Sequence, residues 1–175
     1  MIKHILIITA ALTVTTVNAQ HSNQHQHQHN QMQYAGLQSR EIKALSSQQI
    51  EELKAGKGMS LALPAELNGY PGPAHALELA DKLKLTDEQK KRIQELFNSM
   101  QKEAQKIGLE VIEAEKKLDL LFKDKKVDMQ NLKTATLNAA EAHARLRESH
   151  LRYHLTTTEI LSKEQVAQYN RLRGY

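Results

Sequence analysis

The feature that most constrains the fold is a run of apolar residues recurring at alternating steps of four and three. An apolar stripe with an average spacing of 3.5 residues lies along one side of a helix and is typical of helices that pack side by side. The sequence therefore predicts one helix over residues 87–122, about 54 Å long at the usual rise per residue. The stripe consists of Ile93, Phe97, Met100, Ala104, Ile107, Val111, Ala114, Leu118 and Leu121.

A second long helix is predicted to follow a turn at residues 124–128. Its first half carries small residues on the corresponding side, which allows close approach, and the short turn makes the two helices antiparallel neighbours. Two long helices bury little of their surface, so we expect short flanking helices and a second copy of the chain, as a homodimer, to cover the rest. The second stripe consists of Leu132, Ala135, Ala139, Ala142, Leu146, Ser149, Tyr153, Thr156 and Ile160.

The sequence Leu-[Ser/Thr]-x-x-Gln occurs three times and predicts three helix starts. The Ser or Thr at the N-cap accepts a hydrogen bond from the first turn, and the Gln three residues later reaches back to the cap. The copies are Leu45-Ser46-Ser47-Gln48-Gln49, Leu85-Thr86-Asp87-Glu88-Gln89 and Leu161-Ser162-Lys163-Glu164-Gln165.

The other predicted helices flank the hairpin. One spans residues 40–58, with Ser46 as its cap, and ends at a pair of glycines. Another spans about 74–83, and Pro73 near its first turn removes no helical hydrogen bond. The last runs from Ser162 to the end of the chain. The predicted fold is all-α, with four helices that include a long antiparallel hairpin over residues 73–175, preceded by a short helix and a Pro/Gly linker over residues 40–72.

Composition excludes several classes of protein and of site. The 175 residues include no cysteine, so disulfides and thiolate metal sites are excluded and any metal must use His, Met or carboxylate ligands. The net charge of +4 comes from interspersed charges, whereas a nucleic-acid interface needs a clustered basic stripe. No nucleophile elbow, phosphate-binding glycine loop or metalloprotease motif is present, so we expect no enzymatic activity.

The N-terminal residues predict export. Lys3 precedes an apolar run over residues 5–17, and Val17-Asn18-Ala19 supplies the small residues of a cleavage site. Residues 1–19 are therefore interpreted as a signal peptide cleaved near Ala19, with the mature chain in the periplasm.

A His/Gln-rich stretch follows the predicted cleavage site. Residues 20–39 have no apolar periodicity and are expected to be a disordered tail. The histidines of this tail either chelate metal loosely or simply add solubility. They are His21, His25, His27 and His29.

These features together resemble the Spy/CpxP family of periplasmic proteins, which includes stress chaperones and heavy-metal sensors of the nickel and cobalt resistance type. The likeness rests on Leu85-Thr86-x-x-Gln89 and Leu161-Ser162-x-x-Gln165, with the predicted hairpin between them and an export signal ahead. Residues 70–80 and 169–175 look like the heavy-metal sensor branch. The resemblance covers about residues 70–175 and implies a hooked four-helix hairpin that dimerises into a shallow cradle.

Histidines on the second long helix are the candidate metal ligands. His143, His150 and His154 share one stripe, and the last two have the i, i+4 spacing at which two imidazoles can hold one ion. Folding the hairpin about residues 125 and 126 places His150 opposite Gln101, His154 opposite Phe97 and His143 opposite Gly108. Around His150 and His154 the stripe turns polar, at Ser149, Tyr153 and Thr156, so the packing there is not optimised for apolar burial.

The short helix before the hairpin brings His75 to the same end. We therefore predict a metal site of His75, His150 and His154, completed by Met100 or by a carboxylate such as Glu78, and suited to zinc, nickel, cobalt or copper. The alternative is a set of partly exposed, hydrogen-bonded helix histidines. The resemblance implies ligands on the first and last long helices, often with a His pair on the first; here Leu79 stands four residues after His75 and breaks that pair.

Two non-enzymatic functions follow from these expectations. The first is a periplasmic metal-binding sensor or metal-stress protein, which would pass its signal to a membrane-bound signalling protein. The alternative is an ATP-independent chaperone that binds unfolded periplasmic proteins on the concave surface of the hairpin. No nucleic-acid partner is expected.

Overall fold

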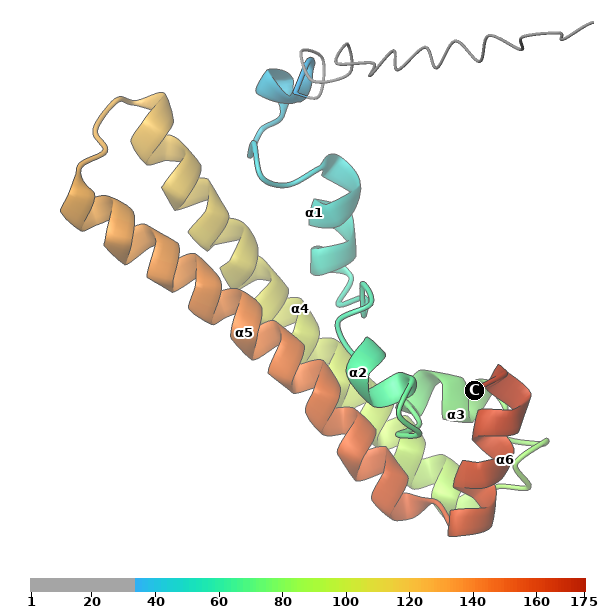
Figure 1. The fold of residues 1–175 in the computed structure, drawn as a ribbon. Coiled ribbons are helices and arrows are strands. Elements are labelled where there is room, and N and C mark those ends of the chain that lie inside the picture. The colour runs from blue at the N-terminus through green and yellow to red at the C-terminus, as the bar shows by residue number, and fades with distance from the viewer. Residues whose placement is uncertain (1–33) are drawn as a thin grey trace, which may run out of the picture. The chain divides into compact units, whose positions relative to one another are not determined.

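The computed structural model describes residues 34–175, and within this range every regular element is a helix (Figure 1). The predicted signal peptide and most of the predicted tail lie outside the described residues. The elements are η2 (Leu37–Ser39), α1 (Ser47–Lys54), α2 (Leu63–Glu66), α3 (Pro73–Glu78), α4 (Asp87–Lys123), α5 (Met129–Ile160) and α6 (Lys163–Arg173).

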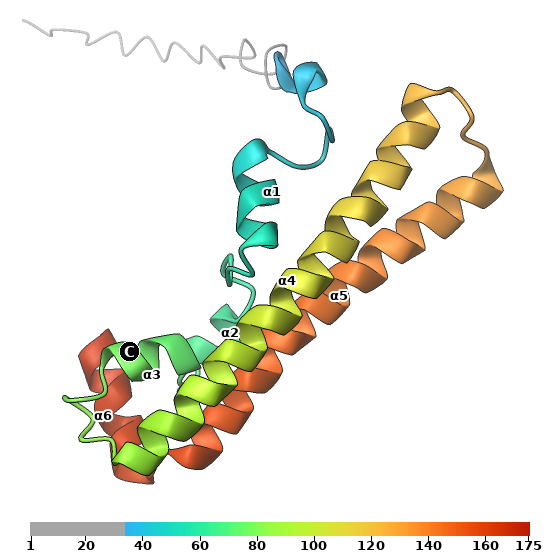
Figure 2. The same ribbon diagram turned by 180° about the vertical axis from the view of Figure 1, so that it is seen from behind.

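Helices α4 and α5 form the predicted antiparallel hairpin, which both views show as two long rods side by side (Figures 1 and 2). The predicted stripes pack tightly in the part of the hairpin away from the turn, where Ile93, Ala104 and Val111 are fully buried. Toward the turn, Leu118 and Leu121 are only half-buried. The apolar stripes are therefore confirmed, but the half of the hairpin near the turn is left partly open.

Each Leu-[Ser/Thr]-x-x-Gln sequence forms the predicted capping box. The hydroxyls of Ser46, Thr86 and Ser162 accept the N–H of the glutamine three residues on, and each glutamine side chain accepts the N–H of the cap residue. At α4 and α6 the capping glutamines, Gln89 and Gln165, also bond to each other. The starts of α4 and α6 are thereby tied together at the end of the hairpin.

An apolar cluster fills the angle between these tied helix starts and α3. It buries Tyr169 of α6 and Ile93 of α4 completely. Its remaining buried members are Ala76, Leu83, Leu85, Ile160 and Leu161. The short elements α3 and α6 are held at this end by apolar burial.

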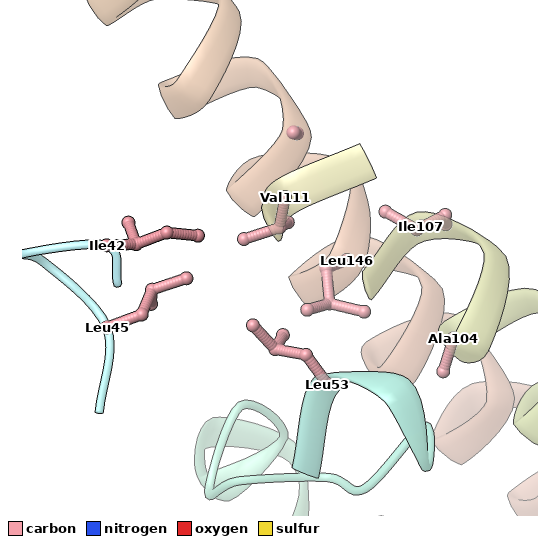
Figure 3. Close-up of a cluster of buried hydrophobic side chains, with 8 residues drawn as sticks. Ile42, Leu45, Leu53, Ala104, Ile107, Val111 and Leu146 are labelled. Carbon is pink, nitrogen blue, oxygen red and sulfur yellow. The ribbon is translucent and has the colours of Figure 1, made fainter. Parts of the chain in front are cut away.

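The segment before α2, residues 36–62, packs along α4, and we call it the arm. Its side chains Ile42, Leu45 and Leu53 enter a cluster formed by the hairpin (Figure 3). The hairpin contributes Ala104, Ile107, Val111, Ala142 and Leu146 to this cluster. The arm is also joined to α4 by Lys43, whose backbone N–H and ammonium group both contact the Asp119 carboxylate at 3.1 and 3.4 Å.

Two glycines allow the arm backbone to touch the backbone of α4. A methyl group added at Gly108 would lie 2.4 Å from the carbonyl oxygen of Leu53, and one added at Gly56 would lie 2.7 Å from the carbonyl oxygen of Gln101. Gly56 also has φ +66, a conformation that favours glycine. The arm therefore approaches α4 more closely than side chains at these positions would permit.

Some predicted helix bounds were wrong. The helix expected over residues 40–58 begins at its predicted cap, Ser46, but is shorter than expected: residues 40–45 lie before the cap, and α1 ends at Lys54. The helix expected over residues 74–83 stops at Glu78, and the turn that follows places Lys84 at φ 51. Conversely, α2 forms within the predicted linker, with Pro64 in its first turn.

The predicted cross-hairpin neighbour of His143 was also wrong. His143 pairs with Glu115, with 2.9 Å between imidazole Nε2 and carboxylate Oε1, while Gly108 contacts Leu53 of the arm. Side chains on a helix lean toward its N-terminus, so in an antiparallel pair each contacts a residue later in the partner than the backbone level suggests. A prediction that counted backbone levels alone therefore paired residues too early.

Candidate functional site

The candidate site is a pocket of about 540 Å³ at the point where the arm meets the hairpin and the short helices. All three histidines of the predicted site line it: His75 from α3, and His150 and His154 from α5. The rest of its wall includes Met59, Glu66, Gly72, Phe97, Met100, Gln101, Arg173 and Tyr175, with the connector at residues 55–63 closing one side. The structure thus brings together residues separated by about half of the described chain.

Glu66 is the polar centre of this region, and it is only 5% exposed. Its Oε1 accepts a hydrogen bond from the hydroxyl of Tyr169 at 2.5 Å and another from Tyr175 at 3.3 Å. The guanidinium of Arg173 lies 3.3 Å from the same oxygen and supplies a compensating positive charge. Because a buried carboxylate is costly unless it is paired, these contacts explain how Glu66 is retained inside the protein.

His75 is held by this carboxylate. Its Nδ1 lies 3.2 Å from Oε1 of Glu66, and because a carboxylate oxygen in this network only accepts, the Nδ1 carries the hydrogen. The other ring nitrogen, Nε2, is then free to bind a ligand. The His75 side chain is 38% exposed, so the ring is partly open to solvent.

His154 is also oriented through its Nδ1, by a backbone carbonyl. Its Nδ1 lies 2.7 Å from the carbonyl oxygen of Tyr70 and 3.7 Å from Oε2 of Glu66, so Nδ1 again carries the hydrogen. Its ring packs against Gly72, where an added methyl group would lie 2.7 Å from Cε1. The loop Tyr70-Pro71-Gly72-Pro73 therefore both orients the imidazole and leaves room for it.

His150 has an unusual environment. The residue is 2% exposed, and its Nε2 is buried without a hydrogen-bond partner among the described residues. Burial lowers the pKa of His150, the nearby His154 lowers it further, and Glu103 opposes both effects. A neutral imidazole with an unused buried nitrogen is a feature that native structures rarely retain without a reason.

Tyr169 completes the support of the carboxylate. Burial, followed by the hydrogen bond to Glu66, raises the pKa of the Tyr169 phenol strongly, while Arg173 and the Gly72 N–H lower it in part. The phenol therefore stays protonated and acts only as a donor toward Glu66. This donor links α6 to the residue that orients His75.

One detail of the predicted site differs from the structure. The carboxylate at the pocket is Glu66, whereas the suggested Glu78 is exposed. His143 shares the helical stripe of the other two histidines but lies farther along α5, paired with Glu115. Sequence reasoning missed Glu66 because it lies in a stretch rich in Pro and Gly that indicated a linker; only its contact with Tyr169, 103 residues away, shows its role.

The three histidines share one pocket but do not converge into a compact cluster. No group of three or more His, Asp or Glu side chains within residues 34–175 has the convergence of a formed metal centre. The structure shows two imidazoles whose Nδ1 atoms have hydrogen-bond partners, a third whose Nε2 has none among the described residues, and a common cavity.

Comparison with known proteins adds no assignment: no family model, curated protein or solved structure matches the chain. Among residues 34–175, no helix is both long and apolar enough to cross a membrane.

Proposed function

We propose that this protein binds a transition metal ion in the pocket lined by His75, His150 and His154. The observation that carries the proposal is the buried, unpartnered Nε2 of His150 in a cavity that the other two imidazoles also line. Imidazole nitrogen is a good ligand for zinc, copper, nickel and cobalt.

The hydrogen bonds around the pocket support this function. Metal-binding histidines usually donate their second ring N–H to a carboxylate or a backbone carbonyl, which fixes the tautomer and the ring orientation. His75 donates to Glu66, and His154 donates to the carbonyl of Tyr70. A ring nitrogen that carries no hydrogen has a lone pair, which it can donate to a bound metal ion.

We further propose that the protein is a non-enzymatic, exported sensor or metal-stress protein related to the Spy/CpxP family. Support for that relationship comes from the hairpin bracketed by two Leu-[Ser/Thr]-x-x-Gln caps, whose glutamines Gln89 and Gln165 contact each other. A change in helix packing on metal binding would alter the surface offered to a membrane-bound signalling protein. Such a signal requires that the metal bind one arrangement of the helices better than another.

Calorimetric titration of the whole chain with zinc, nickel and copper(II) tests the metal proposal. The pair of substitutions His150→Ala and His154→Ala should remove the tightest binding step. His143→Ala is the matched control, because it removes a histidine of the same helix outside the pocket. The histidines near the N-terminus give the same background in all three proteins, so equal titrations would refute the proposal.

A second candidate function is ATP-independent binding of unfolded proteins. It is favoured by the open half of the hairpin, where α4 and α5 border a groove of about 1100 Å³. Leu109 and Leu120 line this groove and are 55% and 37% exposed. Apolar surface of this kind, rimmed by charged residues, is typical of protein-binding sites.

Suppression of the aggregation of a reduced client protein tests this second candidate. Leu120→Lys should weaken the suppression, whereas Leu155→Lys, at an exposed position of α5 outside the groove, should leave it unchanged. No suppression at an equimolar dose of the wild-type protein would refute the chaperone function. The expected homodimer, which could cover the same groove, is measured separately by sedimentation equilibrium.

A further inference from the structure

The pocket also contains two thioethers. Of the three methionines in residues 34–175, Met59 and Met100 line it, while Met129 is 82% exposed. Met100 belongs to α4 and is buried, and Met59 belongs to the arm and is half-buried. Two thioether-bearing residues therefore line the same pocket as the histidines, from two different elements.

The backbone at Met59 is held in an uncommon conformation. Met59 has φ 44 and the next residue, Ser60, has φ 63, so two consecutive residues with side chains occupy the left-handed region. This conformation is unfavourable for residues that have a side chain, and strain of this kind is concentrated at functional sites. The neighbouring Gly58, which could adopt such a φ without strain, has no positive φ.

We propose that the ion bound in this pocket is copper(I), with Met59 and Met100 as thioether ligands beside the imidazoles. This inference rests on the metal-binding function proposed above and specifies which ion the pocket prefers. Thioether and imidazole ligands together suit copper(I), whereas nickel and cobalt have less affinity for thioethers. With no cysteine in the chain, methionine is the soft ligand available, and it forms no competing disulfides after export.

Copper(I) ligation by Met59 would add a further link between the arm and the hairpin. Met59 lies between α1 and α2, and Met100 lies on the hairpin. An ion that binds both side chains joins the arm to α4 directly. Copper(I) therefore strengthens the docking of the arm, and loss of the ion weakens it.

Competition with a coloured copper(I) chelator under anaerobic, reducing conditions tests the proposal on the whole chain. Met59→Leu and Met100→Leu should each weaken copper(I) binding about tenfold or more, which corresponds to about 1.4 kcal/mol. Each should change zinc affinity by less than about threefold, or less than about 0.7 kcal/mol. Leucine and methionine have similar volumes, so the fold is retained, and thermal melts verify this. Met129→Leu is the matched control, because it removes a thioether outside the pocket.

Two further readouts separate the possible failures. X-ray absorption of the copper(I) protein should show sulfur ligands that disappear in the Met59→Leu, Met100→Leu double variant. If the double variant binds copper(I) as tightly as the wild type, or the wild-type protein shows no sulfur ligands, while the His150→Ala, His154→Ala protein binds weakly, the copper(I) proposal is wrong and the metal-binding function stands. If the histidine variant binds every ion as the wild type does, the metal-binding function itself fails.

Discussion

The side-chain amides of Gln89 and Gln165 donate to each other across the starts of α4 and α6, with N–O distances of 2.8 and 3.0 Å. Each amide oxygen also accepts the N–H of its own cap residue. Each amide nitrogen reaches a backbone carbonyl as well, that of Ile160 from Gln89 and that of Leu83 from Gln165. A capping box alone needs only an acceptor, so these added bonds explain why glutamine, and not glutamate, stands at both positions.

Replacing both glutamines by glutamate should therefore cost more than the two single substitutions added together. Glu can still accept the N–H of the cap, but the double variant loses every amide donor and brings two negative charges together. We expect a coupling free energy in the range of about 0.5–3 kcal/mol in a double-mutant cycle from urea unfolding. Gln49→Glu is the control and should lie within about 0.5 kcal/mol of wild type, because exposed Gln49 makes only its capping contact. A strictly additive cycle would contradict this interpretation of the pair.

Gly108→Ala should weaken the docking of the arm while raising the intrinsic stability of α4, the helix that contains Gly108. Alanine stabilises a helix interior by about 1 kcal/mol relative to glycine, yet its methyl group would collide with the carbonyl of Leu53. Hydrogen exchange in α1, together with trypsin cleavage after Lys54, should become faster. The exchange of amides in the middle of α5 should stay slow.

Gly58→Ala is the control for this prediction. A methyl group at Gly58 would meet no atom within 4 Å among the described residues. Exchange in α1 should therefore match that of the wild type. If Gly108→Ala also leaves α1 as protected as in the wild type, the close contact with Leu53 does not hold the arm in place.

Glu66→Gln should weaken metal binding without removing a predicted ligand. The amide presents a poorer acceptor to His75 and removes the charge that balances Arg173, so the imidazole loses its fixed orientation. Loss of such an orienting carboxylate typically lowers metal affinity about 10- to 100-fold. The control is Glu115→Gln, which disrupts an equivalent histidine–carboxylate pair with His143 outside the pocket. Equal affinities in the two variants would show that Glu66 has no part in binding.

The metal-free protein should lose stability as the pH falls below about 6.5. The pKa of His150 is lowered in the folded state, mainly by burial, so below the unfolded pKa of about 6.5 the unfolded chain binds more protons. The unfolding free energy then declines with falling pH until the folded pKa is passed. Urea unfolding at about pH 7.5 and about pH 5, with a chelator present, measures this slope. His150→Gln should have a shallower slope, and an unchanged slope would show that another group is responsible.

The sequence predicted the parts of the fold that depend on local signals. The hairpin followed from an apolar stripe with a spacing of 3.5 residues, and three helix starts followed from capping boxes at Ser46, Thr86 and Ser162. Packing of the arm on α4 was not predicted, because it depends on the absence of a side chain at Gly108 and on the position of Leu53. Nothing in the local sequence around either residue indicates that they meet.

The candidate site could be predicted only in part for the same reason. The i, i+4 spacing placed His150 and His154 on one side of a helix, and topology brought His75 to the same end. The orienting groups, Glu66 and the carbonyl of Tyr70, come from a turn-rich segment whose path depends on long-range contacts with α5 and α6. A prediction from spacing alone therefore found the imidazoles but not the groups that hold them.

Gly72 shows how narrow the tolerance of this region is. Its φ of −83 and ψ of 151 are ordinary for any amino acid, so the backbone alone would accept alanine there. The nearest obstacle to a methyl group there is the ring of His154, at 2.7 Å from Cε1. One additional carbon atom at position 72 would thus displace a single imidazole and change the shape of the pocket while the helices around it keep their arrangement.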